Sequence, residues 1–365
     1  MSRIVVKLGS ALLTQEGLRL NESGIRSWAA QVAGLIDQGH QVVVVSSGAV
    51  AAGLGVLGLT HRPADMPTLQ AAAAAGQSGL ATLWETGFRA QSRASAQILL
   101  THDDLSDRAR YLNARATVLR LLDFNVIPVV NENDTVVTDE IRFGDNDTLA
   151  ALVANLIQAD QLILLTDQQG MYREDPRANP EAELLRQVDA NDRSLDAMAT
   201  GGAGTLGRGG MVTKVQAARL AARSGADTVI AHGQTPDVIL RIAAGDAVGT
   251  RFVAPQQSQT ARKRWLAGHL RLKGQVHLDS GACRALVEQG KSLLPVGVVR
   301  VEGDFQRGEA VAIVDAAGQK LGVGLSNYSA DDARLIMGVP SSELASRLSH
   351  AGEPELVHRD NLALS

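Results

Sequence analysis

The sequence predicts an α/β protein in which a mainly parallel sheet sandwiched by helices is followed by a small β-rich barrel. Through residues 1–255, β-branched runs alternate with helix-patterned stretches, which is typical of a parallel sheet covered on both faces. The composition changes sharply over residues 253–265, which is typical of a linker, and the residues from 273 on hold short β-patterned runs between glycine-rich turns. We therefore expect a first domain over 1–255, a linker over 256–272 and a second domain over 273–365.

The composition is that of a globular protein. The 365 residues are 45% apolar and 20% charged, and this length suits roughly two domains. A formal net charge of −4 gives no sign of general affinity for nucleic acid, and Cys283 has no second cysteine for an internal disulfide. No apolar run approaches the ~18 residues that span a bilayer, and no secretory leader precedes Ile4. We expect a cytoplasmic protein without a membrane segment.

The elements of the first domain can be assigned in order. Arg3–Leu8 is a β-branched run that leads into the turn Gly9-Ser10, which predicts a buried strand. Residues 22–38 have helical apolar spacing and are followed by Gly39, a favourable C-cap. The pattern then predicts a strand over 42–45, an Ala-rich helix over 67–92, a strand over 95–100, an amphipathic helix over 108–124 and a strand over 126–130.

The later elements follow the same alternation. Apolar residues between Val136 and Phe143 suggest a small hairpin, and Asp145 is placed to N-cap a helix that runs to Ile157. Next come a strand over 162–165, a helix near 192–199, a glycine-rich tract over 201–210, a helix bearing Lys214 and a strand over 228–231. In the second domain, the pattern predicts strands over 275–278, 297–301, 310–314 and 321–325 and a helix near 330–337.

Three of the predicted strands end in polar or charged groups, at Lys7, Ser47 and Asn131. In open α/β sheets, ligands bind beyond the carboxyl ends of the strands. The turn from Ser46 to Ala49 also offers hydroxyls and approachable backbone N–H groups at a helix start, which suits a phosphate or a carboxylate. One shared site at these strand ends is the simplest interpretation.

Lysine is rare in this chain. Only six of the 35 basic residues are lysines, and residues 1–262 contain just Lys7 and Lys214. A chain that uses arginine for generic positive charge keeps lysine where a compact ammonium is needed, although an arginine-biased genome could also produce this pattern.

The segment from Asn131 to Asp147 holds six carboxylates, opposed only by Arg142. So many negative charges require cationic partners, unless the segment is a solvated acidic turn or a calcium loop. An EF-hand calcium loop requires a glycine at its sixth position and a glutamate at its twelfth, and these two positions cannot both be matched to this segment.

Glycine-rich motifs give weaker signals. The stretches 202–207 and 53–58 both fit G-x-G-x-x-G, but neither opens a helix directly after a strand, and no P-loop motif is present. The tract 201–210 could be a plain linker, yet it leads into the helix that bears Lys214, an arrangement that suits nucleotide phosphates.

Phosphoryl transfer needs cations around the transferred phosphoryl group, and the protein contributes little covalent chemistry. Lys7 and Lys214 would neutralise the charge, Asp147 would hold both lysines, and a metal would travel with the nucleotide.

Six motifs, in order and across the whole chain, resemble the glutamate 5-kinases of the amino acid kinase family. They are Val5 to Ser10, Ser46 to Gly53, Asn131 to Asp134, Gly144 to Asp147, Leu164 to Tyr172 and Gly209 to Lys214. The resemblance implies the amino acid kinase fold and ATP-dependent phosphorylation of the γ-carboxylate of L-glutamate to glutamyl 5-phosphate, the first step of proline biosynthesis. Related kinases of acetylglutamate, aspartate, carbamate or nucleoside monophosphates are the nearest alternatives.

The resemblance also implies roles for single residues. Those that would bind glutamate are Ser47, Gly48, Asn131, Asp134 and Asn146. Those that would bind ATP, with Mg²⁺ carried by the nucleotide, are Lys7, Thr166, Asp167, Arg208, Gly209, Gly210, Met211, Val212, Thr213 and Lys214. The chain departs from the family pattern at Arg208, where a small residue is usual, and at Arg142, where lysine is usual. Nucleotide affinity could differ as a result.

The second domain resembles a PUA domain, on residues that include Asp279 to Ala282, Ser292 to Leu294, Gly303 to Phe305 and Gly308-Glu309. Other PUA domains bind RNA, which leaves an RNA-binding protein as the alternative of a different class. Residues 266–365 carry ten lysines and arginines against twelve aspartates and glutamates, so the basic surface expected of an RNA binder is lacking. The resemblance further implies feedback inhibition by proline, homo-oligomerisation and functional coupling to glutamyl phosphate reductase.

Overall fold

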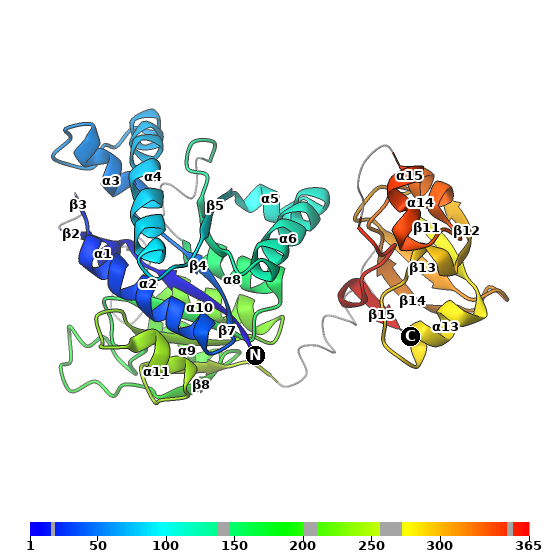
Figure 1. Ribbon diagram of the computed structural model, residues 1–365. Helices are drawn as coiled ribbons and strands as arrows, with labels where there is room; N and C mark the ends of the chain where they lie inside the picture. Colours follow the sequence, from blue (N-terminus) through cyan, green and yellow to red (C-terminus); the bar gives the residue numbers. More distant parts are fainter. Residues whose placement is uncertain (16–18, 138–145, 200–209, 256–271, 349–352, 365) are drawn as a thin grey trace. The chain divides into compact units, whose positions relative to one another are not determined.

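The structure is a computed structural model that describes residues 1–15, 19–137, 146–199, 210–255, 272–348 and 353–364. The chain divides into two compact units, Met1–Ser258 and Gln259–Ser365 (Figure 1). The predicted linker lies outside the described residues except for Leu272.

The first unit is built on an eight-stranded sheet with the strand order β5-β6-β4-β1-β7-β9-β10-β8. Its strands are β1 (Arg3–Leu8), β4 (Gln41–Val45), β5 (Ser95–Leu100), β6 (Ile127–Glu132), β7 (Gln161–Thr166), β8 (Gln187–Asp189), β9 (Asp227–His232) and β10 (Thr250–Val253). Neighbouring strands are parallel except β9 and β10, which pair antiparallel. The predicted mainly parallel sheet is therefore confirmed.

Helices cover both faces of this sheet because its central strands are apolar on both sides. Val6 and Val44 pack in one buried cluster with residues of α2 (Glu22–Asp37), α4 (Met66–Arg89) and α11 (Val238–Ala243). Val5 and Val43 pack in the opposite cluster with residues of α6 (Arg108–Asp123), α8 (Asn146–Ile157) and α10 (Met211–Ala222). Alternate residues of one strand thus reach opposite cores.

Most of the predicted elements are present within a few residues of their expected ends. The predicted helices over 22–38, 67–92 and 108–124 correspond to α2, α4 and α6, and the helix predicted near 192–199 is α9 (Ser194–Ala199). The sequence pattern did not predict α1 (Ser10–Leu13), α5 (His102–Ser106), the edge strand β8 or the short hairpin of β2 (Thr14–Gln15) and β3 (Arg19–Leu20). None of the described helices is both long and apolar enough to cross a membrane.

The end of β6 differs from the prediction. The strand was expected to stop at residue 130, but it continues through Asn131 and Glu132, which pair with Leu99 and Leu100 of β5. Both side chains are buried, so this end of the acidic segment is not a solvated turn. Val136 lies in an exposed turn and Val137 follows it. The rest of the predicted hairpin, the proposed cap Asp145 and the tract 201–209 lie outside the described residues, which resume at Asn146 and at Gly210.

Helix α3 (Ala49–Val56) and α4 approach one another at two glycines, and they lie side by side in Figure 1. A Cβ atom on Gly76 would lie 2.3 Å from the Gly53 nitrogen and 2.0 Å from the Ala49 carbonyl oxygen. A Cβ atom on Gly53 would lie 1.7 Å from the Ala72 carbonyl oxygen. These are backbone atoms that cannot rotate away, so only glycine permits this contact.

The second unit contains a five-stranded mixed sheet with the order β12-β11-β13-β14-β15. The strands are β11 (Gly274–Leu278), β12 (Val298–Gly303), β13 (Ala310–Val314), β14 (Lys320–Leu325) and β15 (Leu362–Leu364), and the helices are α13 (Ser280–Val287), α14 (Ala330–Ile336) and α15 (Leu344–Arg347). Val276, Ile313 and Ile336 belong to its own buried core. The expectation of a small β-rich domain is confirmed.

Replacing Gly76 with alanine should destabilise the first unit, because the added methyl group meets the backbone of α3. We expect the free energy of unfolding to fall by about 1–3 kcal/mol, as is usual for overpacking, measured by chemical denaturation monitored by circular dichroism.

Gly79 on the same helix is the matched control, because a Cβ atom there meets nothing within 4 Å. Gly79→Ala should raise the unfolding free energy by about 0.5–1 kcal/mol through better helix propensity. Equal effects of the two substitutions would show that the α3–α4 contact tolerates a side chain.

Candidate functional site

The polar groups predicted at strand ends are brought together by the order of the sheet. Strands β6, β4, β1 and β7 are consecutive neighbours and run parallel, so their carboxyl ends lie along one edge. Asn131 is the second-last residue of β6, and Ser46 directly follows β4. Lys7 is the second-last residue of β1, and Thr166 is the last residue of β7. The predicted convergence of Lys7, Ser47 and Asn131 is therefore present.

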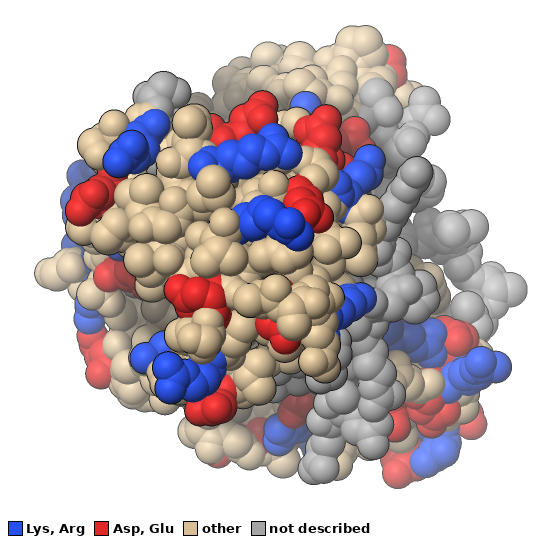
Figure 2. Space-filling view, turned by 90° about the vertical axis from the view of Figure 1, so that its right-hand side faces the viewer, with Lys and Arg blue, Asp and Glu red and all other residues tan. Residues whose placement is uncertain are grey.

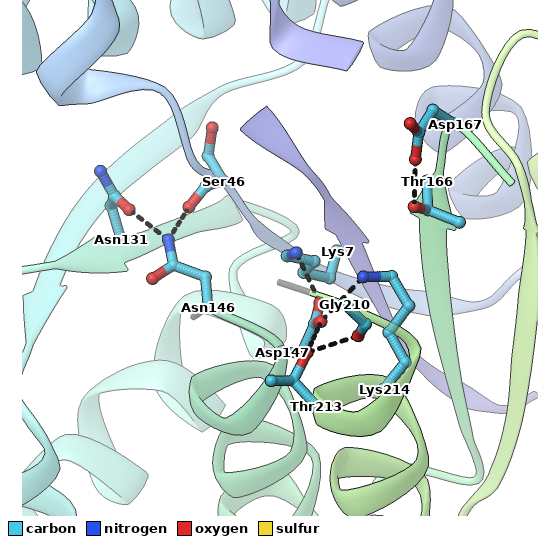
Figure 3. A network of polar contacts seen from close by, with 10 residues as sticks. All are labelled: Lys7, Ser46, Asn131, Asn146, Asp147, Thr166, Asp167, Gly210, Thr213 and Lys214. Carbon is cyan, nitrogen blue, oxygen red and sulfur yellow. Dashed lines mark hydrogen bonds and ion pairs between the residues drawn. The ribbon is translucent and has the colours of Figure 1, made fainter. Parts of the chain in front are cut away.

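A buried ion cluster occupies the middle of this edge (Figure 3). Lys7 Nζ lies 2.5 Å from Asp147 Oδ1, and Lys214 Nζ lies 3.1 Å from Asp147 Oδ2. The Asp147 side chain is 0% exposed, and the two lysine side chains are 5% and 6% exposed. The three residues come from β1, α8 and α10, so no local segment could assemble them.

The fold explains why these side chains meet. Lys7 follows Val5 by two positions in β1, so it points to the sheet face covered by α8 and α10. Asp147 lies in the first turn of α8, which packs on α10. Lys214 lies in the first turns of α10. The hydroxyl of the preceding residue, Thr213, lies 3.0 Å from Asp147 Oδ2 and 2.8 Å from the Gly210 carbonyl oxygen.

The charge state of Asp147 follows from these contacts. Burial by itself raises the pKa of this carboxyl, but the charges of Lys7 and Lys214 and their hydrogen bonds outweigh burial and hold the pKa well below its ordinary value of 3.8. The carboxylate is therefore ionised at neutral pH, and it fixes two ammonium groups on its two oxygens.

A chain of side-chain amides lies next to the ion cluster (Figure 3). Asn146 Nδ2 donates to the Ser46 carbonyl oxygen at 2.6 Å and to Asn131 Oδ1 at 2.8 Å. Asn131 Nδ2 in turn donates to Gln77 Oε1 on α4 at 2.7 Å. Because Asn146 and Asp147 are consecutive residues, the amide chain and the ion cluster are held by the same helix start.

The turn that follows β4 is fixed by three buried groups. Trp84 Nε1 donates to Ser46 Oγ at 2.9 Å, and that hydroxyl donates to the Ser47 carbonyl oxygen at 3.2 Å. Gly48 then precedes α3 with φ of 99°, a left-handed conformation that favours glycine. Ser47 itself is 5% exposed.

The sequence motifs pointed to the turn from Ser46 to Ala49, and the family resemblance assigned Ser47 within it, but neither pointed to Gln77 or Trp84. In the structure, Ser46 contacts the amide chain through its backbone carbonyl oxygen. Gln77 and Trp84 lie on an Ala-rich helix with no motif, and the one available signal was their spacing of seven residues.

The other predicted residues occupy the rim of this edge. Thr166 is buried and its hydroxyl donates to Asp167 Oδ1 at 3.0 Å, while Asp167 is exposed. Gly210 precedes α10 without a side-chain cap, and Met211 and Val212 begin that helix. Asp134 lies in the turn after β6 and is partly buried. Arg208 and Gly209 lie outside the described residues.

Comparison with known proteins gives a consistent family assignment. The family model described as "Amino acid kinase family" matches residues 2–232, and the model described as "PUA domain" matches residues 274–348.

Two full-length relatives are both named "Glutamate 5-kinase". The protein of Paracidovorax citrulli is 55% identical over 367 residues, which cover 100% of this chain and 97% of that one. The protein of Chromobacterium violaceum is 56% identical over 360 residues, which cover 99% of this chain and 97% of that one.

Among solved structures, the UMP kinase of Bacillus anthracis superposes with a TM-score of 0.49 and 17% identity, covering 69% of this chain and 96% of that one.

Asp147→Asn should destabilise the fold, because two buried ammonium groups lose their countercharge while the side chain keeps its shape. We expect the free energy of unfolding at neutral pH to fall by about 3–5 kcal/mol, the usual cost of breaking a buried ion pair. Asp167→Asn is the matched control, since this carboxylate is exposed, and it should change stability by less than about 0.5 kcal/mol.

The pH dependence has a defined sign. The folded pKa of Asp147 lies below the unfolded value of 3.8, so its contribution is fully present above pH 3.8 and is lost as the pH falls below that value. The stability difference between the wild type and Asp147→Asn should therefore narrow in acid. A constant difference down to pH 2, measured by urea denaturation, would contradict this assignment.

Proposed function

The chain belongs to the amino acid kinase family, and from that premise we propose that it uses ATP to phosphorylate the γ-carboxylate of L-glutamate, the first step of proline biosynthesis. The relatives named "Glutamate 5-kinase" match it over nearly their whole length. The structural observation that carries the proposal is the pair of lysines held on one buried aspartate beside a chain of oriented amides.

The chemistry follows from the ion cluster. An oxygen of the substrate γ-carboxylate attacks the γ-phosphorus of ATP, the bond from that phosphorus to the bridging oxygen breaks, and ADP leaves with glutamyl 5-phosphate as the product. Negative charge on the transferring group is stabilised by preorganised cations more than by covalent chemistry. Lys7 and Lys214 are those cations. Asp147 positions both ammonium groups and, being ionised and fully buried, does not act as a proton donor.

Residues at the start of α10 and the end of β7 form the proposed nucleotide side of the site. Gly210 offers no side-chain cap, so within the described part of the chain the backbone N–H groups in the first turn of α10 would face phosphate oxygens. Thr166, Asp167 and the run Gly210 to Lys214 would contact ATP, together with Arg208 and Gly209. Mg²⁺, when bound, neutralises phosphate charge. It would be carried by the nucleotide, because Asp147 is engaged with both lysines.

The amide chain and the turn after β4 form the proposed glutamate side. Ser47 and Gly48 would donate to a substrate carboxylate, while Asn131 and Asn146 border the same space. Asp134 would accept from the α-ammonium group, which a carboxylate holds better than a neutral group does. Proline, which resembles cyclised glutamate, would compete here. The family resemblance also predicts a homo-oligomer and functional coupling to glutamyl phosphate reductase.

RNA binding by the second unit has less physical support. Figure 2 shows a face on which the described lysine and arginine side chains are interspersed with aspartate and glutamate. Affinity for RNA backbones needs a concentrated basic surface. The excess of acids between residues 266 and 365 and the mixed charge of this one face both speak against RNA binding there.

The substrate assignment is tested with Mg-ATP and three acceptors: L-glutamate, N-acetylglutamate and L-aspartate. A hydroxamate assay traps the acyl phosphate directly. We expect turnover with glutamate and little with N-acetylglutamate, because acetylation removes the charge that Asp134 would bind. Turnover of N-acetylglutamate without turnover of glutamate would refute the proposed substrate.

Lys7→Ala and Lys214→Ala should each lower kcat by about 10²–10³-fold, the usual loss when one preorganised charge is removed from a transition state. Lys320→Ala is the matched control, since this lysine is exposed in the second unit. Thermal denaturation establishes that each variant is folded. A folded variant of Lys7 or Lys214 with a normal kcat would remove that lysine from the phosphoryl site.

A further inference from the structure

Helix α4 presents three hydrogen-bonding side chains to the candidate site at intervals of seven residues. Gln70 Nε2 donates to the Val137 carbonyl oxygen at 3.1 Å, Gln77 Oε1 accepts from Asn131, and Trp84 Nε1 donates to Ser46 Oγ. Side chains seven positions apart lie on the same helix face, two turns along. One face of α4 therefore contacts both the turn after β4 and the segment after β6.

The direction of every amide in the chain is fixed by one backbone group. A carbonyl oxygen can only accept, so the Asn146 atom that faces the Ser46 carbonyl must be the nitrogen. The other hydrogen on that nitrogen is used by Asn131 Oδ1, which places the Asn131 nitrogen on the opposite side, toward Gln77. The usual ambiguity between oxygen and nitrogen in an amide is thereby removed.

This direction determines what Asn146 can offer to a ligand. Both hydrogens of its side-chain nitrogen are already donated, so its carbonyl oxygen is the atom left to interact, and it can only accept. In Figure 3 that oxygen points away from Ser46 and Asn131. An acceptor suits an ammonium group and repels a carboxylate.

We infer that Gln77 is a positioning residue of the glutamate site, which holds Asn131 and thereby keeps the Asn146 carbonyl oxygen directed at the substrate α-ammonium. The inference rests on the proposed function. Asn131 is 2% exposed, so without an acceptor at position 77 its buried N–H group loses its partner and the amide rotates. Asn146 then loses one of its two acceptors and its fixed orientation.

The test compares Gln77→Leu with the wild type, using glutamate and glutarate, which keeps both carboxylates but lacks the ammonium group. We expect the KM for glutamate to rise about tenfold, the effect of losing one oriented hydrogen bond, while kcat and the KM for ATP stay unchanged. The inhibition constant of glutarate should not change. A general structural defect would weaken glutamate and glutarate together.

Two further variants sharpen the result. Gln77→Glu keeps an acceptor oxygen at the same reach and should restore most of the affinity for glutamate. Gln91→Leu, at an exposed glutamine just beyond the same helix, should change nothing. Gln77→Ala replaces Gln77→Leu if the latter does not fold, and failure of both to fold would mark Gln77 as structural and overturn the inference.

Parallel losses of glutamate and glutarate binding, or an unchanged KM, would likewise overturn it. A wild-type protein that does not phosphorylate glutamate refutes the proposed function itself, which separates the two failures.

Discussion

The buried carboxylate of Asp147 is the interaction on which the rest of the site depends. Two ammonium groups at 5% and 6% exposure would repel one another and lack solvation without it. Their attraction to one carboxylate ties β1, α8 and α10 together at the edge of the sheet where the strands end. The same contact leaves both cations oriented toward one region, so the group that stabilises the cluster also preorganises it for an anionic ligand.

The adjacent residues Asn146 and Asp147 make two different kinds of contact: Asn146 hydrogen-bonds to neutral groups, and Asp147 pairs with the two lysines. Successive helix residues point in directions about 100° apart, so the first turn of α8 can serve the amide chain with one residue and the lysines with the next. The ion cluster lies on the side where phosphoryl transfer is proposed. The neutral hydrogen bonds of the amide chain lie on the side proposed for the amino acid, where Asp134 would add one carboxylate.

Helix α4 joins the proposed substrate side to the body of the fold. Its glycine contact with α3 fixes the helix that begins just after Gly48, while Gln77 and Trp84 fix the segments that carry Asn131 and Ser46. The backbone contact and the Trp84 hydrogen bond thus act on the turn after β4, and the Gln77 hydrogen bond acts on β6 from the same helix. A helix rich in alanine and glycine is suited to this role because its small side chains allow backbones to come close together.

The sequence alone determined the parallel α/β architecture, because apolar periodicity and strand–helix alternation are local patterns that survive without tertiary information. The scarcity of lysine singled out Lys7 and Lys214, and the motifs carried the family resemblance and the identity of Asp147. The tertiary structure decided the strand order, the continuation of β6 through Glu132 and the amide chain from Ser46 to Gln77. The physical reason is that each of these depends on partners distant in sequence: β5 alongside Asn131, a backbone carbonyl after β4, and the packing of a helix whose sequence carries no motif.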